Sequence, residues 1–266
     1  MFHNFLYYEV TGSGPALVFA HGLGGNHLSW WQQVPHFANR CTCVTFAHRG
    51  FYPSREAVDG PGPRAFADDL AALIEHLKLG SVTLVGQSMG GWTCLEYALR
   101  EPNRVRAMVL ASTSGTVDYR LIKHHKLKDP DAWLAHSRTA IAELRRRGII
   151  PAAGERMSRD QPALAHLYSG LNALSPPEYR EQVRVEIQRL CSKPPEVLSR
   201  LSMPVLYITG EEDPQFPPHA AAALAAMTPR GRSVCVSEAG HSVYFERAAV
   251  FNRLVDEFLA ESDTGI

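Results

Sequence analysis

Residues 82–91 read VTLVGQSMGG, an apolar run that leads into glycines around a single serine. The run from Val82 to Val85 is typical of a buried strand, and apolar side chains follow at helical spacing from Cys94 to Leu99. A strand, a G-x-S-x-G turn and a helix in this order hold the serine on a sharp, strained turn with its hydroxyl exposed. We therefore predict that Ser88 is a nucleophile.

Similar apolar runs recur along the chain and predict further strands. Segments of helical period lie between several of them, for instance from Phe66 to Leu77, which Gly80 ends, and from Phe251 to Leu259. Because strands and helices alternate and the strand runs are apolar on both faces, we predict an α/β fold with a mostly parallel sheet flanked by helices. The predicted strands are Ala16 to Ala20, Thr42 to Phe46, Val82 to Val85, Met108 to Ala111, Val205 to Thr209 and Val234 to Val236.

The alternation stops between about Ser114 and Pro204, where helical patterns at residues 133–144 and 179–190 occur without a strand-like run. A block of this size is too large for a simple crossover. We predict an inserted helical cap above the carboxyl ends of the strands, where open α/β sheets bind ligands. The predicted domains are a core of residues 1–113 and 204–266 and a cap of residues 114–203.

A serine nucleophile needs a base, and the base needs an orienting acid. Two predicted strands near the C-terminus end in polar loops, one at Asp213 and one at His241. Both lie after Ser88 in the order Ser, Asp, His that accompanies a G-x-S-x-G turn. Glu211 and Glu212 are rival acids. We rank Asp213 first because the proline-rich loop that follows it suits a fixed, inward-turned carboxylate.

Acyl transfer also needs hydrogen-bond donors aimed at the developing oxyanion. One is the backbone N–H of Met89, directly after the nucleophile, and the second is expected from a loop after an early strand. The loop His21-Gly-Leu-Gly-Gly makes the N–H of Leu23 that second donor, with His21 in a structural role. Because serine and two backbone donors supply the nucleophile and the oxyanion stabilisation, we expect no metal and no cofactor.

With these residues in hand, the chain resembles the α/β-hydrolase superfamily from about Val18 to Leu259. The matching motifs are H-G-x-G at His21–Gly24, the turn at Gly86–Gly90, G-x-x-D at Gly210–Asp213 and G-H at Gly240–His241. The resemblance implies a serine hydrolase with a triad of Ser88, Asp213 and His241.

One loop departs from the family pattern. The family often has D-x-R-G-x-G-x-S after the second parallel strand, whereas residues 47–54 here read AHRGFYPS. Ala47 replaces the aspartate, which is not a triad member, and Tyr52 replaces the second glycine. The departure therefore affects the local order of this loop and the width of the pocket.

The resemblance leaves several activities open. A serine at the turn argues against epoxide hydrolases and haloalkane dehalogenases, which use aspartate there. Our leading prediction is a carboxylic ester hydrolase acting on a small or medium uncharged ester or lactone, because the apolar content is 45% and no charged cluster lies near the triad in the sequence. Alternatives are a carbon–carbon bond hydrolase, a perhydrolase, and a ligand-sensing signalling protein that retains the triad. The aromatic pocket candidates are Trp92, Trp133, Tyr168 and Tyr244.

Composition limits the partners. The 27 Lys and Arg balance the 27 Asp and Glu, so no summed charge attracts nucleic acid or an acidic membrane. No apolar run approaches the roughly 20 residues of a membrane-spanning helix. The first ten residues lack the features of a secretory signal, and five cysteines suit reduced thiols, so we expect a cytoplasmic location and a small-molecule substrate. The oligomeric state is not predicted.

Overall fold

The apolar runs form a mostly parallel sheet. The computed structural model describes residues 1–3, 5–55, 60–123 and 129–263, and within these ranges an eight-stranded sheet has the order β1-β2-β4-β3-β5-β6-β7-β8. Strands β3 to β8 are parallel to one another, whereas at one edge β2 pairs antiparallel with both β4 and β1. The strands are β1 (Phe2–His3), β2 (Leu6–Thr11), β3 (Ala16–Ala20), β4 (Thr42–Phe46), β5 (Val82–Gln87), β6 (Val105–Ala111), β7 (Val205–Gly210) and β8 (Gly231–Val236).

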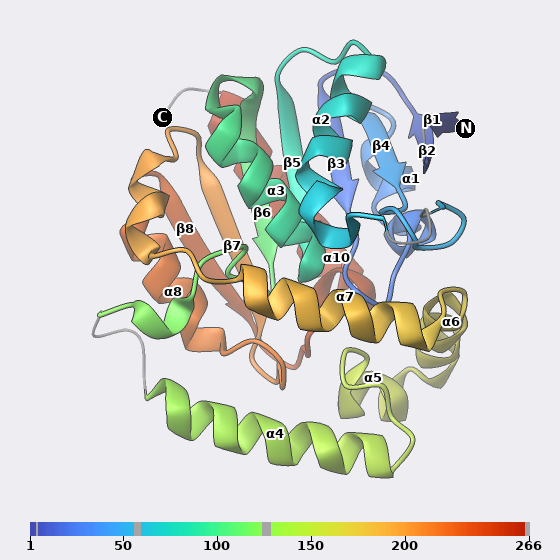
Figure 1. Ribbon diagram of the computed structural model, residues 1–266, viewed down its shortest axis with the longest axis vertical. Helices are drawn as coiled ribbons and strands as arrows, with labels where there is room; N and C mark the ends of the chain where they lie inside the picture. The colour runs from blue at the N-terminus through green and yellow to red at the C-terminus, as the bar shows by residue number, and fades with distance from the viewer. Residues whose placement is uncertain (4, 56–59, 124–128, 264–266) are drawn as a thin grey trace.

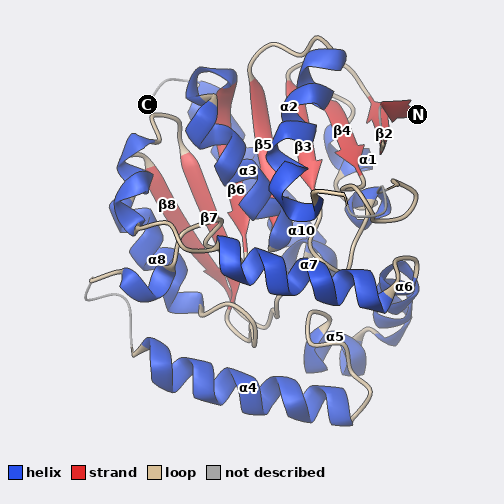
Figure 2. Cartoon of the chain, in the orientation of Figure 1, coloured by secondary structure: helices blue, strands red, loops and turns tan. Residues whose placement is uncertain are grey.

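Helices cover the sheet on both sides, so the predicted α/β class is confirmed (Figure 2). None of the described helices is long and apolar enough to cross a membrane. The α-helices are α1 (Val34–Phe37), α2 (Phe66–His76), α3 (Met89–Arg100), α4 (Pro130–Arg146), α5 (Gly154–Asp160), α6 (Pro162–Ala173), α7 (Pro177–Leu190), α8 (Pro218–Met227), α9 (Val243–Glu246) and α10 (Ala248–Asp263). Short 3₁₀ helices are η1 (His27–Trp30), η2 (Gly62–Ala65), η3 (Pro102–Arg104), η4 (Tyr119–Leu121) and η5 (Pro195–Arg200).

Successive strand residues pack on opposite faces of the sheet, as the pleat requires. Val18 and Leu84 belong to one buried cluster together with side chains of α2, α3 and α8. Leu17 and Val85 belong to another, together with side chains of α1 and α10. Burial on both faces explains why the central strands read as continuous apolar runs.

The order of the strands reverses at β3, which lies between β4 and β5. Open α/β sheets bind ligands at such a switch point, outside the carboxyl ends of the strands. The parallel register pairs Ala20 with Gly86, so β3 and β5 end level with each other. The loop after β3 and the turn at Ser88 therefore begin side by side.

The chain between β6 and β7 is helical, as the sequence predicts. Helices α4 and α7 run across the end of the sheet toward which the parallel strands point, and α5 and α6 lie beside them (Figure 1). Ser137 of α4 donates a hydrogen bond of 2.6 Å to the carbonyl of Pro214, in the loop after β7. These helices stand over the carboxyl ends of the strands, and the assignment of residues 114–203 as a cap domain stays a proposal.

The edges of the sheet differ from the sequence prediction. Strands β1 and β2 were not expected; β2 pairs with β4 and has a buried and a more exposed side, so it lacks the fully apolar run of a central strand. Strand β8 is the opposite edge, and most of its side chains are not buried. The expectation that every strand run is covered on both faces is therefore wrong for β8, where Cys235 is exposed.

Candidate active site

Ser88 lies on the turn between β5 and α3 in a backbone conformation that only few residues adopt. Its φ is 50° and its ψ is −115°, and such strained geometry persists where the surroundings fix it. The N–H of Ser88 donates to the carbonyl of Ala111 at 2.9 Å. A Cβ atom on Gly86 would lie 2.7 Å from the backbone of Gly90, so only glycine allows strand and helix to approach this closely.

His241 and Asp213 meet from the loops after β8 and β7. Nδ1 of His241 lies 2.9 Å from both carboxylate oxygens of Asp213, and both side chains are buried. The Asp213 carboxylate also accepts backbone N–H groups of Gln215 at 2.8 Å and Phe216 at 3.0 Å. These bonds fix the carboxylate. The carboxylate in turn orients the ring, with Nδ1 as the donor and Nε2 as the free proton acceptor.

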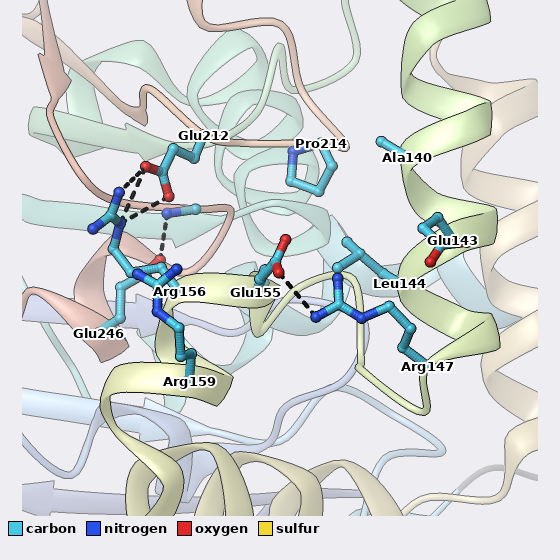
Figure 3. Close-up of a pocket in the computed structure, with 12 residues that line it drawn as sticks. Ala140, Glu143, Leu144, Arg147, Glu155, Arg156, Arg159, Glu212, Pro214 and Glu246 are labelled. Carbon is cyan, nitrogen blue, oxygen red and sulfur yellow. Dashed lines mark hydrogen bonds and ion pairs between the residues drawn. The ribbon is translucent and has the colours of Figure 1, made fainter.

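The rival acids lie elsewhere. Glu212 forms an ion pair with Arg156 beside a second cavity of about 470 Å³ (Figure 3), and Glu211 is exposed. In this second cavity Arg147 also meets Glu155 at 2.9 Å. Its charged groups therefore neutralise one another.

Ser88 and His241 both line a cavity with a volume of about 670 Å³. Among the described residues no hydrogen bond joins Ser88 Oγ to the His241 ring, and in sites without substrate such bonds are often long. Leu23 and Met89, the predicted oxyanion donors, line the same cavity. Met89 is the first residue of α3, where a backbone N–H has no partner within the helix.

A chain of buried hydrogen bonds holds the loop that carries Leu23. Nε2 of His21 accepts the N–H of His48 at 2.9 Å, so the proton of His21 is on Nδ1, which donates to the carbonyl of Gly22 at 2.7 Å. His48 Nδ1 lies 3.0 Å from His21 Nε2, and its Nε2 lies 3.0 Å from Thr93 Oγ1. Burial lowers the pKa of His21 to about 3 and that of His48 well below its usual value. Both rings are neutral at neutral pH, consistent with the structural role expected for His21.

Gln87 connects the two halves of the site. Its Nε2 donates to the carbonyl of His241 at 3.2 Å, and its Oε1 lies so close to Gly22 that a Cβ atom on Gly22 would collide with it. The side chain is buried and lines the cavity. Gln87 thus contacts both the His241 loop and the loop of Leu23.

Of the four aromatic residues expected at the pocket, Tyr168 lines the cavity and the other three do not. Trp92 lies one helical turn after Ser88 and belongs to a buried cluster with Phe51 and Phe66, so its ring is part of the core. The ring centroid of Tyr244 lies 4.5 Å from that of Trp30, also within the core.

Trp133 is half-buried near the start of α4 and lies outside the cavity lining. In the sequence, Trp92 and Tyr244 are close to Ser88 and His241 and Trp133 belongs to the predicted cap, whereas the direction of each ring depends on helix packing.

The loop that departs from the family pattern is held by the predicted cap. The hydroxyl of Tyr179 donates to the carbonyl of Arg49 at 2.9 Å, and Ser175 Oγ accepts the N–H of Tyr52 at 3.1 Å. The Tyr52 side chain is exposed and does not line the cavity. The substitution of Tyr52 for glycine therefore does not narrow this pocket.

The cavity is more charged than the sequence indicated. Arg145, Arg180, Glu181 and Arg184 all line it, so the absence of a charged cluster near the triad, one reason for expecting an uncharged substrate, is wrong. These residues come from α4 and α7, far from Ser88 in the sequence. No spacing signal singles them out among the many arginines of these helices. No group of three or more His, Cys, Asp or Glu side chains in the described ranges is arranged to hold a metal ion.

Comparison with known families agrees with this fold. A family model described as the alpha/beta hydrolase fold matches residues 15–248, a span that includes Leu23, Ser88, Asp213 and His241. The chain belongs to the alpha/beta hydrolase fold family, and the resemblance inferred from its motifs is confirmed.

Three similar proteins show the range of the family. The chain is 30% identical over 264 residues to BpoC of Mycobacterium tuberculosis, a non-heme bromoperoxidase by name, with 96% of this chain and 97% of the relative covered. It is 26% identical to 3-oxoadipate enol-lactonase 2 of Acinetobacter baylyi, with 91% and 87% covered. The structure of a thermophilic esterase from Thermogutta terrifontis superposes with a TM-score of 0.74 at 25% identity, covering 97% of this chain and 93% of that one.

Proposed function

We propose that this protein hydrolyses a carboxylic ester or lactone through an acyl-enzyme on Ser88. The observation that carries the proposal is the buried contact of His241 Nδ1 with both Asp213 oxygens, 2.9 Å each, beside a cavity that Ser88 also lines. This arrangement supplies a nucleophile, a base and an orienting acid. The lactonase and esterase among the similar proteins support the same class of substrate.

The proposed reaction has two halves. In the first, His241 Nε2 takes the proton of Ser88 Oγ while the oxygen attacks the acyl carbon, and the backbone N–H groups of Leu23 and Met89 stabilise the oxyanion. His241 then gives the proton to the departing alkoxide. In the second half a water molecule, deprotonated by His241, attacks the acyl-enzyme, and Ser88 leaves with the proton. The products are a carboxylic acid and an alcohol, joined in one molecule when the substrate is a lactone.

A fluorophosphonate probe tests the nucleophile. The probe reacts with serines that have an activated hydroxyl, so we expect a single adduct on Ser88 and none in the Ser88→Ala variant. Ser114 lines the same cavity and is the matched control: Ser114→Ala should label as the parent protein does. An adduct on another serine, or no adduct, contradicts the assignment.

A substrate panel tests the reaction class. We expect steady turnover of short and medium phenyl esters or of lactones, abolished in Ser88→Ala. Turnover of ring-cleavage products alone would instead indicate carbon–carbon bond hydrolysis. A single turnover followed by a lasting change in the fluorescence of Trp133 would indicate a ligand sensor.

The similarity to BpoC favours perhydrolysis as a second candidate. Hydrogen peroxide in place of water would attack the same acyl-enzyme and release a peracid, which oxidises bromide. We expect this candidate to show bromination that requires both a carboxylic acid or ester and peroxide and that is lost in Ser88→Ala. Bromination that survives in Ser88→Ala would exclude the acyl-enzyme route.

A further inference from the structure

Arg180 of α7 lines the cavity of Ser88 and forms no ion pair with a carboxylate in the described ranges. Its Nη1 donates to the amide oxygen of Asn172 in α6. Nε is buried and has no hydrogen-bond acceptor in the described ranges, and no carboxylate there lies within ion-pair distance of the guanidinium. Burial lowers the pKa of Arg180 by more than the Glu178 carboxylate, which lies beyond ion-pair distance, raises it.

Several other arginines around the site have carboxylate partners, and Arg145, which has no ion pair among the described residues, is exposed to solvent. Arg184, one turn further along α7, forms an ion pair with Glu181. In the second cavity Arg156 pairs with Glu212 (Figure 3), and Arg159 pairs with Asp160 at 2.6 Å. The structure thus neutralises these guanidinium groups with its own carboxylates and leaves Arg180 with a neutral amide.

A neighbouring phenol does not supply the missing charge. Tyr168 also lines the cavity, and its hydroxyl accepts a hydrogen bond of 3.1 Å from Ser242. Burial raises the pKa of Tyr168 to about 12, so the phenol is neutral at neutral pH. It can still donate its own proton to an acceptor in the cavity.

The position of Arg180 connects it to the reacting end of the cavity. The side chain of Asn172, which Arg180 contacts, lies so close to Gly24 that a Cβ atom on Gly24 would collide with it. Gly24 follows Leu23, the proposed oxyanion donor. A group bound by Arg180 therefore lies near a substrate whose carbonyl faces Leu23 and Met89.

We propose that Arg180 binds a carboxylate of the substrate, so that the preferred ester or lactone carries a free acid group besides the bond that is cleaved. Arginine recognises carboxylates through its planar fork of N–H donors. Nη2 has no hydrogen-bond partner among the described residues and can bind one oxygen directly. Nε is buried, so a carboxylate can contact both Nε and Nη2 only after a small rotation of the Arg180 side chain. This inference rests on the proposed function and replaces the expectation of an uncharged substrate.

Matched substrate pairs test the preference. Monophenyl adipate carries a carboxylate on the acyl side of the ester, and phenyl adipamate carries the isosteric amide in its place. 4-Acetoxybenzoate and 4-acetoxybenzamide make the same comparison on the alcohol side. We expect kcat/KM of the parent protein to favour the carboxylate at least about tenfold in one of the two pairs, the range of a hydrogen bond to a charged group. No preference in either pair overturns the inference.

Substitution at Arg180 tests the contact. In Arg180→Met, kcat/KM for the preferred carboxylate should fall about 10- to 100-fold, whereas kcat/KM for its amide should stay within about threefold. Arg180→Lys, which keeps the charge and loses the fork, should retain part of the preference and serves where the methionine variant fails to fold. An equal loss for both substrates means a structural role and overturns the inference.

Arg145→Met is the matched control, because Arg145 lines the same cavity, carries the same charge and is exposed to solvent. We expect the carboxylate preference to survive in this variant within about threefold, since exposed charges are screened. A loss as large as in Arg180→Met would assign the preference to the general field of the cavity and not to Arg180.

A binding measurement separates this inference from the proposed function. In the Ser88→Ala background, adipate should raise the melting temperature, since a ligand that binds only the folded state stabilises it. Adipamide should not, and Ser88→Ala with Arg180→Met should respond to neither. If the Ser88 chemistry fails while the adipate shift stands, the proposed function is wrong and the carboxylate site is right. If adipate gives no shift, the carboxylate site is wrong.

Discussion

Asp213 and His241 come from different loops, 28 residues apart in the sequence, yet His241 Nδ1 lies 2.9 Å from each oxygen of the Asp213 carboxylate. Two backbone N–H groups hold that carboxylate, and no other acid in the described ranges forms an ion pair with His241. The contact selects Asp213 over its sequence neighbours as the group that orients the proposed base.

This contact predicts how acid substitutions rank. Asp213→Asn should lower kcat by roughly 10²- to 10⁴-fold, because an amide can hold His241 in the wrong tautomer. Glu212→Gln is the matched control and should keep kcat within about threefold, since Glu212 pairs with Arg156 at the surface. Steady-state kinetics on one phenyl ester measure both. Comparable losses in the two variants would contradict the assignment of the acid.

The buried pair of His21 and His48 predicts a loss of stability in acid. Burial lowers the pKa of His21 to about 3, below the 6.5 of an ordinary histidine, so between these values the unfolded chain binds more protons than the folded one. The contribution of this ring is therefore full above pH 6.5 and falls as the pH drops toward 3.

His48→Gln tests this network. At pH 7 it should lower the free energy of unfolding by about 1–3 kcal/mol, the range for leaving a buried polar group unsatisfied. At pH 5 the decrease should be smaller, because the parent protein has itself begun to lose the stability that its neutral buried rings contribute. Urea unfolding at the two pH values measures the difference. His136→Gln, a change of an exposed histidine in α4, should leave both values within about 0.5 kcal/mol. An equal deficit at both pH values would show that the buried rings do not titrate as argued.

Glu246, which accepts a hydrogen bond from the backbone of the His241 loop, predicts the opposite dependence of stability on pH. Its Oε1 accepts the N–H of Gly240 at 2.6 Å, and burial raises the pKa of the carboxyl from 4.5 to about 7. Between these values the folded protein binds more protons than the unfolded chain, so the stability falls as the pH rises from 4.5 to 7.

Glu246→Gln should keep an acceptor for Gly240 and remove the titration. The variant should be more stable than the parent protein by about 1–3 kcal/mol at pH 8 and nearly equal to it at pH 4.5. Urea unfolding measures this, with the exposed Glu257→Gln as the control. A gain of the same size at both pH values would be inconsistent with a buried, titrating carboxyl.

The lining of the cavity predicts which aromatic residue sets substrate choice. Tyr168 lines the cavity, and Tyr168→Phe removes the hydroxyl that accepts a hydrogen bond from Ser242, so the variant should change the ranking of kcat/KM across an ester series. Trp133→Phe, outside the lining, should leave the ranking unchanged. Should Trp133→Phe reorder the series while Tyr168→Phe does not, the cavity is not where the substrate binds.

The sequence by itself determined the strands of the central sheet and the identity of the turn at Ser88. Both are local properties. A strand buried on both faces must be apolar throughout, as at Val82 to Val85, and a strand can turn sharply into a helix only where residues such as Gly86 carry no side chain. The edge strands β2 and β8 were harder to predict, because a strand at the edge of the sheet is partly exposed and need not be apolar throughout.

Only the tertiary structure decided which side chains meet. Asp213, Glu211 and Glu212 are neighbours in the sequence, and the backbone donors of Gln215 and Phe216 determine which carboxylate turns inward. The packing of helices likewise turns Trp92 and Tyr244 into the core and Tyr168 into the cavity.

The packing of helices also decided the surroundings of Arg180. Its place in the cavity that Ser88 lines, and the absence of an ion pair with a carboxylate in the described ranges, follow from how α7 crosses the end of the sheet with α6 beside it (Figure 1). An ion pair depends on distances between segments that are far apart in the chain, whereas the sequence shows only spacing along it. The chemistry of the turn could therefore be predicted from the residues themselves, and the charge that faces the substrate could not.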